Sequence, residues 1–140
     1  MILGVGFDLV DIARVAALLE GKGERAVARL FSPAEAEYAR ARAEPARHFA
    51  ARFAAKEAVY KALAGSEDAR GIGWRDTEVV VEWDGRPRAV LHGRAAERAA
   101  ALGVVRVHLS LTHAEHVAGA VVVLEGEPPR SSVPADTPGA

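Results

Sequence analysis

Cysteine is absent from this 140-residue chain, and that absence excludes three kinds of chemistry. The chain forms no disulfides, has no thiolate nucleophile and offers no cysteine ligands to zinc. Long apolar runs are also absent, since no stretch approaches the ~20 apolar residues that a membrane-spanning helix needs. Residues 1–14 lack a basic segment and carry Asp8 and Asp11, so we expect no signal peptide. These absences predict a soluble, cytoplasmic protein without a membrane partner.

The net charge of the chain is only −1. A charge this small argues against a general nucleic-acid-binding protein. Residues 22–61 are nevertheless rich in basic side chains, and such an excess suits an anionic partner or ligand. Nine residues are basic (Lys22, Arg25, Arg29, Arg40, Arg42, Arg47, Arg52, Lys56, Lys61) and five are acidic (Glu24, Glu35, Glu37, Glu44, Glu57). The alternative is a solvated helix surface, which charge counting alone favours.

The order of helical and extended patterns predicts the fold class. Half of the residues are apolar, so we expect one globular domain with a real core. Helical patterns cover residues 11–20, 24–31, 33–42, 45–64 and 93–102, and extended patterns cover 2–9, 77–83, 88–92, 104–111 and 117–124. We therefore predict an α+β fold in which an antiparallel sheet packs against a long helix. The domain should span residues 1–125, and the Pro/Ser-rich residues 126–140 should form a tail.

The first strand places a carboxylate at the end of a cleared face. Leu3, Val5, Phe7 and Leu9 alternate with Ile2, Gly4, Gly6 and Asp8. Two glycines on one face allow another backbone or a ligand to approach closely. Asp8 stands at the end of that glycine face and is a candidate ligand.

Glu57 occupies an unexpected position on the helix predicted for residues 45–64. At about 100° per residue it falls beside the stripe formed by Phe49, Phe53 and Tyr60. A carboxylate held against apolar surface is costly unless a partner compensates its charge. Lys61, one turn later, is a candidate partner, and a divalent cation is a stronger one.

Asp8 and Glu57 together form a candidate metal site. Mg²⁺ prefers hard oxygen ligands and commonly takes one or two carboxylates, with water and phosphate filling its remaining positions. Two local interactions are the alternative, in which Asp8 caps the following helix and Glu57 pairs with Lys61. In the metal–phosphate hypothesis, Lys61 contacts a phosphate.

Further candidate phosphate contacts lie on the same helix and at a strand end. Arg52 and Lys56 are four residues apart on a flank of the helix, where single basic residues are most often surface charges. Ser110, Thr112 and His113 follow a strand and could contact phosphate or ribose. They do not indicate a hydrolytic triad, because the chain has no G-x-S-x-G elbow.

Four sequence blocks, in order, resemble the holo-acyl-carrier-protein synthase family of 4′-phosphopantetheinyl transferases. They are GVGFDLVDIAR (4–14), RFAAKEAVYKAL (52–63), GRP (85–87) and LSLTH (109–113). The second block is the most specific, and the resemblance covers residues 2–124. Phe7 stands where a smaller aliphatic residue is usual, and Thr112 where serine is also common.

The resemblance implies an Mg²⁺-dependent transferase, with Mn²⁺ as a possible substitute. A serine of an acyl carrier protein attacks the β-phosphate of coenzyme A, and 3′,5′-ADP leaves. Asp8 and Glu57 match the metal ligands of the family, and Lys61 would contact the phosphates and stabilise the leaving group. The candidate general base is Glu57 or a metal-bound water that Glu57 orients.

The resemblance also implies how the two substrates bind. Arg52, Lys61 and His113 would contact coenzyme A phosphates, and Gly85 and Pro87 would shape the adenosine pocket. Three arginines would meet the acidic carrier protein: Arg14, Arg25 and Arg29. Family members commonly form homotrimers with active sites between subunits.

Two alternatives to this function stay open at the level of sequence. The acceptor could be a carrier domain of a polyketide or peptide synthase. The chain could instead be a non-catalytic module that binds coenzyme A or a carrier protein. Intact Asp8, Glu57 and Lys61 favour an enzyme.

Overall fold

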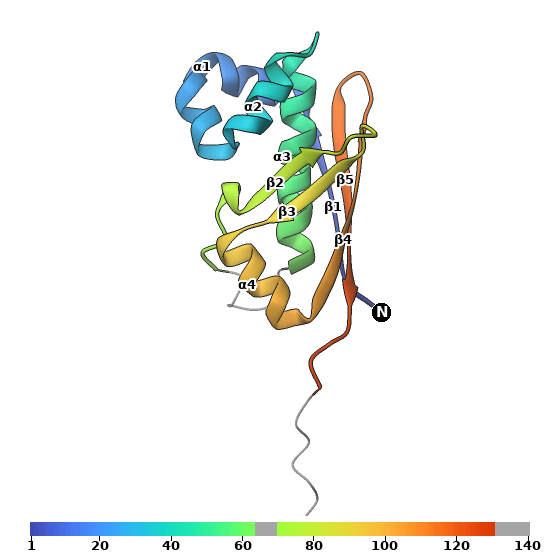
Figure 1. Ribbon diagram of the computed structural model, residues 1–140. Helices are drawn as coiled ribbons and strands as arrows, with labels where there is room; N and C mark the ends of the chain where they lie inside the picture. The colour runs from blue at the N-terminus through green and yellow to red at the C-terminus, as the bar shows by residue number, and fades with distance from the viewer. Residues whose placement is uncertain (64–69, 131–140) are drawn as a thin grey trace, which may run out of the picture.

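A long central helix organises the computed structural model, which describes residues 1–63 and 70–130. The helices are α1 (Ile12–Leu30), α2 (Pro33–Arg40), α3 (Pro45–Leu63) and α4 (Gly93–Leu102), with a 3₁₀ turn η2 (Trp74–Asp76). The strands are β1 (Ile2–Asp11), β2 (Thr77–Val81), β3 (Pro87–Leu91), β4 (Val104–His113) and β5 (Val117–Gly126). Helices α1 and α2 lie near the start of α3, and α4 lies near its end (Figure 1).

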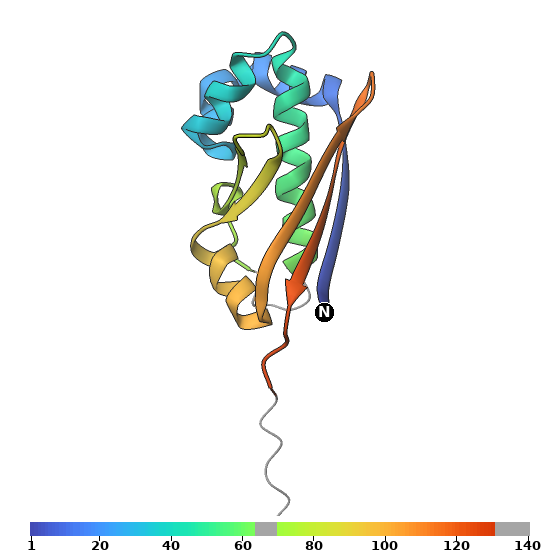
Figure 2. The same cartoon turned by 45° about the vertical axis from the view of Figure 1, so that its right-hand side comes forward.

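The strands form two antiparallel sheets, which confirms the predicted α+β class. The larger sheet has the order β1-β5-β4, and β2 pairs with β3 in a separate hairpin. Helix α3 packs on β1 and β5, so the predicted contact between a sheet and the long helix is also confirmed. The other helices lie on the same side of the larger sheet as α3 (Figure 2).

The backbone of α3 lies directly against the face of β1 that carries Gly4 and Gly6. A Cβ atom added at Gly6 would lie 1.7 Å from the carbonyl oxygen of Ala58. One at Gly4 would lie 2.5 Å from the carbonyl oxygen of Ala62. Only glycine permits this approach, which holds Asp8 on β1 beside the later part of α3.

The opposite face of β1 is apolar and exposed. Val5, Phe7 and Leu9 are 59%, 54% and 58% exposed, and Val121 of β5, which pairs with Phe7, is 37% exposed. A row of apolar side chains on one sheet face is an unusual surface for a soluble domain. We call these four residues the apolar stripe.

Two helix starts follow their predicted caps, but one helix end does not. The Asp11 carboxylate accepts a hydrogen bond from the amide of Ala13, and Ser32 and Glu35 form the predicted capping box. We expected the first helix to end before Gly21. The helix continues past Gly21, and its helical conformation is interrupted at Gly23 (φ 50°, ψ −127°), where a residue with a side chain would be strained.

Lys56 is buried, so its predicted place on a surface flank is wrong. Its ammonium lies 2.9 Å from Oε1 of Glu35 and donates to the carbonyls of Trp74 and Thr77. The other oxygen of Glu35 accepts a hydrogen bond from the amide of Val79. This buried pair joins α2, α3, η2 and β2, and the satisfied hydrogen bonds offset its desolvation.

The predicted tail begins where the last strand ends. Residues 127–130 have neither helix nor strand, and residues 131–140 lie outside the described residues. Residue 64, the expected end of the long helix, also lies outside them, and the domain boundary stays a prediction. Within residues 1–63 and 70–130, no helix is both long enough and apolar enough to span a membrane.

Candidate functional site

Asp8, Glu57 and Lys61 converge where β1 meets α3. The Lys61 ammonium lies 2.9 Å from Oδ1 of Asp8 and donates to the carbonyl of Phe7 at 3.2 Å. Asp8 and Glu57 line the same groove. Residues separated by about fifty positions therefore share one small surface, as the metal-site hypothesis requires.

The part of the chain that the structure describes contains neither of the two local interactions proposed as the alternative, the helix cap by Asp8 and the Glu57–Lys61 ion pair. Asp11, not Asp8, caps the first helix, and Lys61 pairs with Asp8. Among the described residues, no ion pair joins Glu57 to Lys61 within 4.0 Å. Glu57 thus lies near a second carboxylate, and Lys61 acts on it only through its charge at a longer distance.

The environment of Glu57 raises the pKa of its carboxyl group above the usual value. Burial is the largest cause, the charge of Asp8 adds to it, and Lys61 acts in the opposite direction. A carboxylate in this position gains from a further positive charge.

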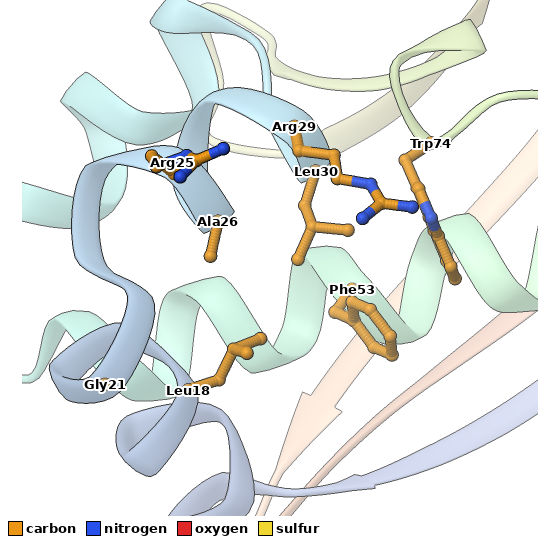
Figure 3. A pocket seen from close by; sticks show the side chains of 8 residues that line it. All are labelled: Leu18, Gly21, Arg25, Ala26, Arg29, Leu30, Phe53 and Trp74. Carbon is orange, nitrogen blue, oxygen red and sulfur yellow. The ribbon is translucent and has the colours of Figure 1, made fainter.

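Two grooves lie next to each other on this side of α3, and they share Leu18, Gly21, Leu30 and Phe53. One of about 720 Å³ runs from Asp8 and Glu57 along α1, and one of about 850 Å³ continues it past Phe53. Figure 3 shows the second groove, with Leu18, Leu30 and Phe53 at its apolar wall. Phe53 stacks on Trp74 with ring centroids 5.1 Å apart.

The three arginines expected to meet a carrier protein border these grooves. Arg14 lines the groove that contains Asp8 and Glu57, whereas Arg25 and Arg29 line its continuation (Figure 3). All three are exposed. The break at Gly23 lies between Arg14 and the other two, so the two parts of α1 contribute cations to neighbouring grooves.

Arg52 belongs to a different group of side chains. It is 3% exposed, and its guanidinium carbon lies 4.2 Å from the ring centroid of Tyr38. Its Nη1 donates to the carbonyl of His48 at 3.3 Å, and its buried Nε has no partner among the described residues. We call Arg42, Arg47, His48, Arg52 and His113 the cationic cluster.

His113 joins this cluster from the end of β4. Its charge contributes to lowering the pKa of His48, after burial and the charges of Arg52 and Arg42. Gly85 lies in the turn between β2 and β3, and Pro87 begins β3. The predicted coenzyme A contacts therefore come from α3, from the β2–β3 turn with the start of β3, and from the end of β4.

Helix geometry explains why Arg52 lies away from the group formed by Asp8, Glu57 and Lys61. Arg52 and Lys61 are nine residues apart on α3, which corresponds to about 14 Å along the axis and about 180° around it. The structure brings Asp8, Glu57 and Lys61 together in one chain. It does not bring Arg52 into that group.

Sequence reasoning missed Tyr38, Arg42 and His48. Their signal is a pair of i,i+4 spacings, Tyr38 to Arg42 and His48 to Arg52. Each spacing is common on a helix surface. Only the packing of α2 against α3 shows that the two pairs meet.

Nearly the whole chain matches a known family. The model of the 4′-phosphopantetheinyl transferase superfamily matches residues 4–121. The chain belongs to this superfamily. The resemblance found in the four sequence blocks is thereby confirmed, and the superfamily includes relatives that are similar over almost their full length.

Two of these relatives are holo-[acyl-carrier-protein] synthases. The one from Anaeromyxobacter dehalogenans (strain 2CP-1 / ATCC BAA-258) is 51% identical over 132 residues, which cover 92% of this chain and 100% of the relative. The one from Koribacter versatilis (strain Ellin345) is 46% identical over 125 residues, with coverage of 89% and 99%. The match extends well beyond the central motif.

Solved structures of the superfamily share the fold. Acyl carrier protein synthase of Mycobacterium tuberculosis aligns with a TM-score of 0.71 and 44% identity, covering 91% of this chain and 100% of that one. The ACPS–CoA complex of Chronobacterium ammoniagenes aligns with a TM-score of 0.77 and 30% identity, covering 89% and 97%. These alignments agree with the expected 4′-phosphopantetheinyl transferase fold.

Proposed function

We propose that this chain transfers 4′-phosphopantetheine from coenzyme A to a serine of an apo acyl carrier protein and releases 3′,5′-ADP. The observation that carries the proposal is the convergence of Asp8, Glu57 and Lys61 at the head of a groove. Membership of the superfamily supplies the reaction class. Relatives near 50% identity are holo-[acyl-carrier-protein] synthases, and a solved relative binds CoA.

The donor set fits a small divalent cation. Asp8 and Glu57 would hold it, and among the described residues no group of three or more His, Cys, Asp or Glu side chains could hold a metal. Two carboxylates leave positions for water and phosphate oxygens, as Mg²⁺ prefers, and Mn²⁺ accepts similar ligands. A cation bound there would neutralise part of the negative charge on the pyrophosphate oxygens.

The side chains of the site have distinct tasks in the transfer. The serine oxygen forms a bond to the β-phosphorus while the bond to the bridging oxygen breaks, so 3′,5′-ADP carries the electron pair away. Glu57 is placed to accept or direct the serine proton. Lys61, half exposed beside Asp8, is placed to contact the phosphates and stabilise the departing charge.

We infer that the docking surface for the carrier protein is the arginine border of the two grooves. Arg14, Arg25 and Arg29 are exposed there, and the groove floor is apolar. Acyl carrier proteins are acidic, so this border would attract the partner and orient its serine toward Glu57. The cytoplasmic location expected from the sequence stays a prediction.

We infer that the active form is a homotrimer that shares each coenzyme A between subunits. Arg52 lies half a turn around α3 from Lys61, so it suits a molecule bound by a neighbouring copy, and we assign Gly85, Pro87 and His113 to the same molecule. The apolar stripe on the uncovered sheet face offers the surface for that neighbour. A ring of three copies closes such a heterologous contact.

The substitution Phe7→Glu tests the trimer. It adds a charge to the centre of the apolar stripe, so we expect monomers by light scattering on a sizing column and loss of transferase activity. Val105→Glu is the matched control, because Val105 is 82% exposed on the same sheet but lies outside the stripe. A wild-type mass for Phe7→Glu would contradict the proposed interface.

Mass spectrometry of the carrier protein tests the proposed function. We expect an apo acyl carrier protein incubated with coenzyme A, Mg²⁺ and this chain to gain the mass of one phosphopantetheine. The same assay on carrier domains of polyketide and peptide synthases compares the possible acceptors. Binding of coenzyme A with no mass gain on any carrier would show a non-catalytic module instead.

A further inference from the structure

Tyr38 contacts three residues of the cationic cluster and has no part in the function proposed so far. The guanidinium carbons of Arg42 and Arg52 lie 4.0 Å and 4.2 Å from its ring centroid. The ring of His48 meets it edge-on, with centroids 5.9 Å apart. One partly buried aromatic ring thus contacts Arg42, which lies between α2 and α3, and two basic side chains of α3.

Such a cluster is costly without an anion. Like charges placed together repel, and the pKa of His48 is lowered by burial and by the charges of Arg52, Arg42, His113 and Arg47. Glu44 pairs with Arg47 at 2.8 Å, and the buried Glu35 favours the charged form of Arg52. These two carboxylates face five basic side chains, so they do not balance the charge of the cationic cluster.

Tyr38 interacts with both arginines through its ring face and its hydroxyl group. Arg52 has five N–H donors, of which Nη1 donates to the carbonyl of His48 at 3.3 Å, and its buried Nε is unpartnered among the described residues. The face of an aromatic ring attracts a guanidinium, and the phenol oxygen adds a hydrogen-bond acceptor. Hydrogen bonding to Arg42 is the main cause that lowers the pKa of Tyr38, and Arg52 adds to it.

We propose that Tyr38 is a positioning residue that fixes Arg42 and Arg52 so that the cationic cluster receives a phosphate of coenzyme A. The proposal rests on the proposed function, because it takes coenzyme A as the ligand. Arg52 forms the buried base of the cluster, and Arg42 and His113 form its exposed side. Without Tyr38 the two guanidiniums lose their shared support and move apart.

The test separates substrate binding from turnover. For Tyr38→Leu, which removes both ring and hydroxyl, we expect the KM for coenzyme A to rise about tenfold, with kcat within about twofold of wild type. Tyr38→Phe keeps the ring and should give an intermediate KM. Isothermal titration with 3′,5′-ADP should show the same order of affinities without relying on turnover.

Controls separate this role from a general loss of structure. Arg42→Gln should raise the KM for coenzyme A as Tyr38→Leu does. Arg40→Gln should not, because Arg40 lies at the end of α2 and pairs with Glu24. Thermal midpoints identify variants that fail to fold, and Tyr38→Phe then carries the test. An unchanged KM and 3′,5′-ADP affinity in folded Tyr38→Leu would overturn the inference even if wild type transfers phosphopantetheine normally. Wild-type inactivity would instead overturn the proposed function.

Discussion

Glu57→Gln is expected to lower turnover about 100-fold or more while the fold survives. The substitution keeps the shape of the side chain but removes the negative charge that would hold the cation and accept the proton. The Asp8–Lys61 ion pair, which does not involve Glu57, should remain. Steady-state transfer to an apo acyl carrier protein at saturating Mg²⁺ measures the effect.

Glu37→Gln provides the matched control for that experiment. Glu37 is an exposed residue of α2 outside the site, so the same change of charge there should leave turnover near wild type. The thermal midpoint of Glu57→Gln should be equal to or above that of wild type, because burial opposes the charged form of this carboxyl. Near-normal turnover in Glu57→Gln would reject the role assigned to it.

Gly6→Ala is expected to destabilise the fold by about 3 kcal/mol or more. Its Cβ would lie 1.7 Å from the carbonyl oxygen of Ala58 and 2.7 Å from the carbonyl carbon. Both are backbone atoms in the middle of α3, so no side chain can rotate away. The strand and helix must separate, which also pulls Asp8 from Glu57. Denaturant unfolding followed by circular dichroism measures the loss.

Gly21→Ala is the control for the glycine experiment. A Cβ atom at Gly21 meets no atom within 4 Å, and the residue lies inside the helical stretch of α1. Alanine is the better helix former, so this variant should be about 0.5–1 kcal/mol more stable. Equal unfolding midpoints for Gly6→Ala and wild type would mean that β1 and α3 are not in the contact described.

The sequence was sufficient for the parts of the site that depend on local pattern. Alternation along residues 2–9 predicts the two faces of β1, and glycine on one of them predicts a close approach. Helical periodicity places Glu57 beside the row formed by Phe49, Phe53 and Tyr60. What joins these parts is the packing of β1 on α3, which the ordered motifs of the family indicated and spacing alone did not.

Burial was the property that the sequence predicted least well. Lys56 looks like a surface charge because its partner, Glu35, lies 21 residues earlier in α2. The apolar side of β1 looks like the core side by composition, yet the glycine side is the one against α3. Tyr38 and Arg52 meet through the packing of two helices, and no short spacing in the sequence records that contact.

Mn²⁺ binding tests the central claim most directly, because the account depends on Asp8 and Glu57 sharing one divalent cation. Electron paramagnetic resonance would follow Mn²⁺ titrated into the protein in the presence of coenzyme A. We expect one ion per chain in wild type and in Glu37→Gln, and an affinity about tenfold or more weaker in both Asp8→Asn and Glu57→Gln. Wild-type affinity in both of these variants would contradict the account.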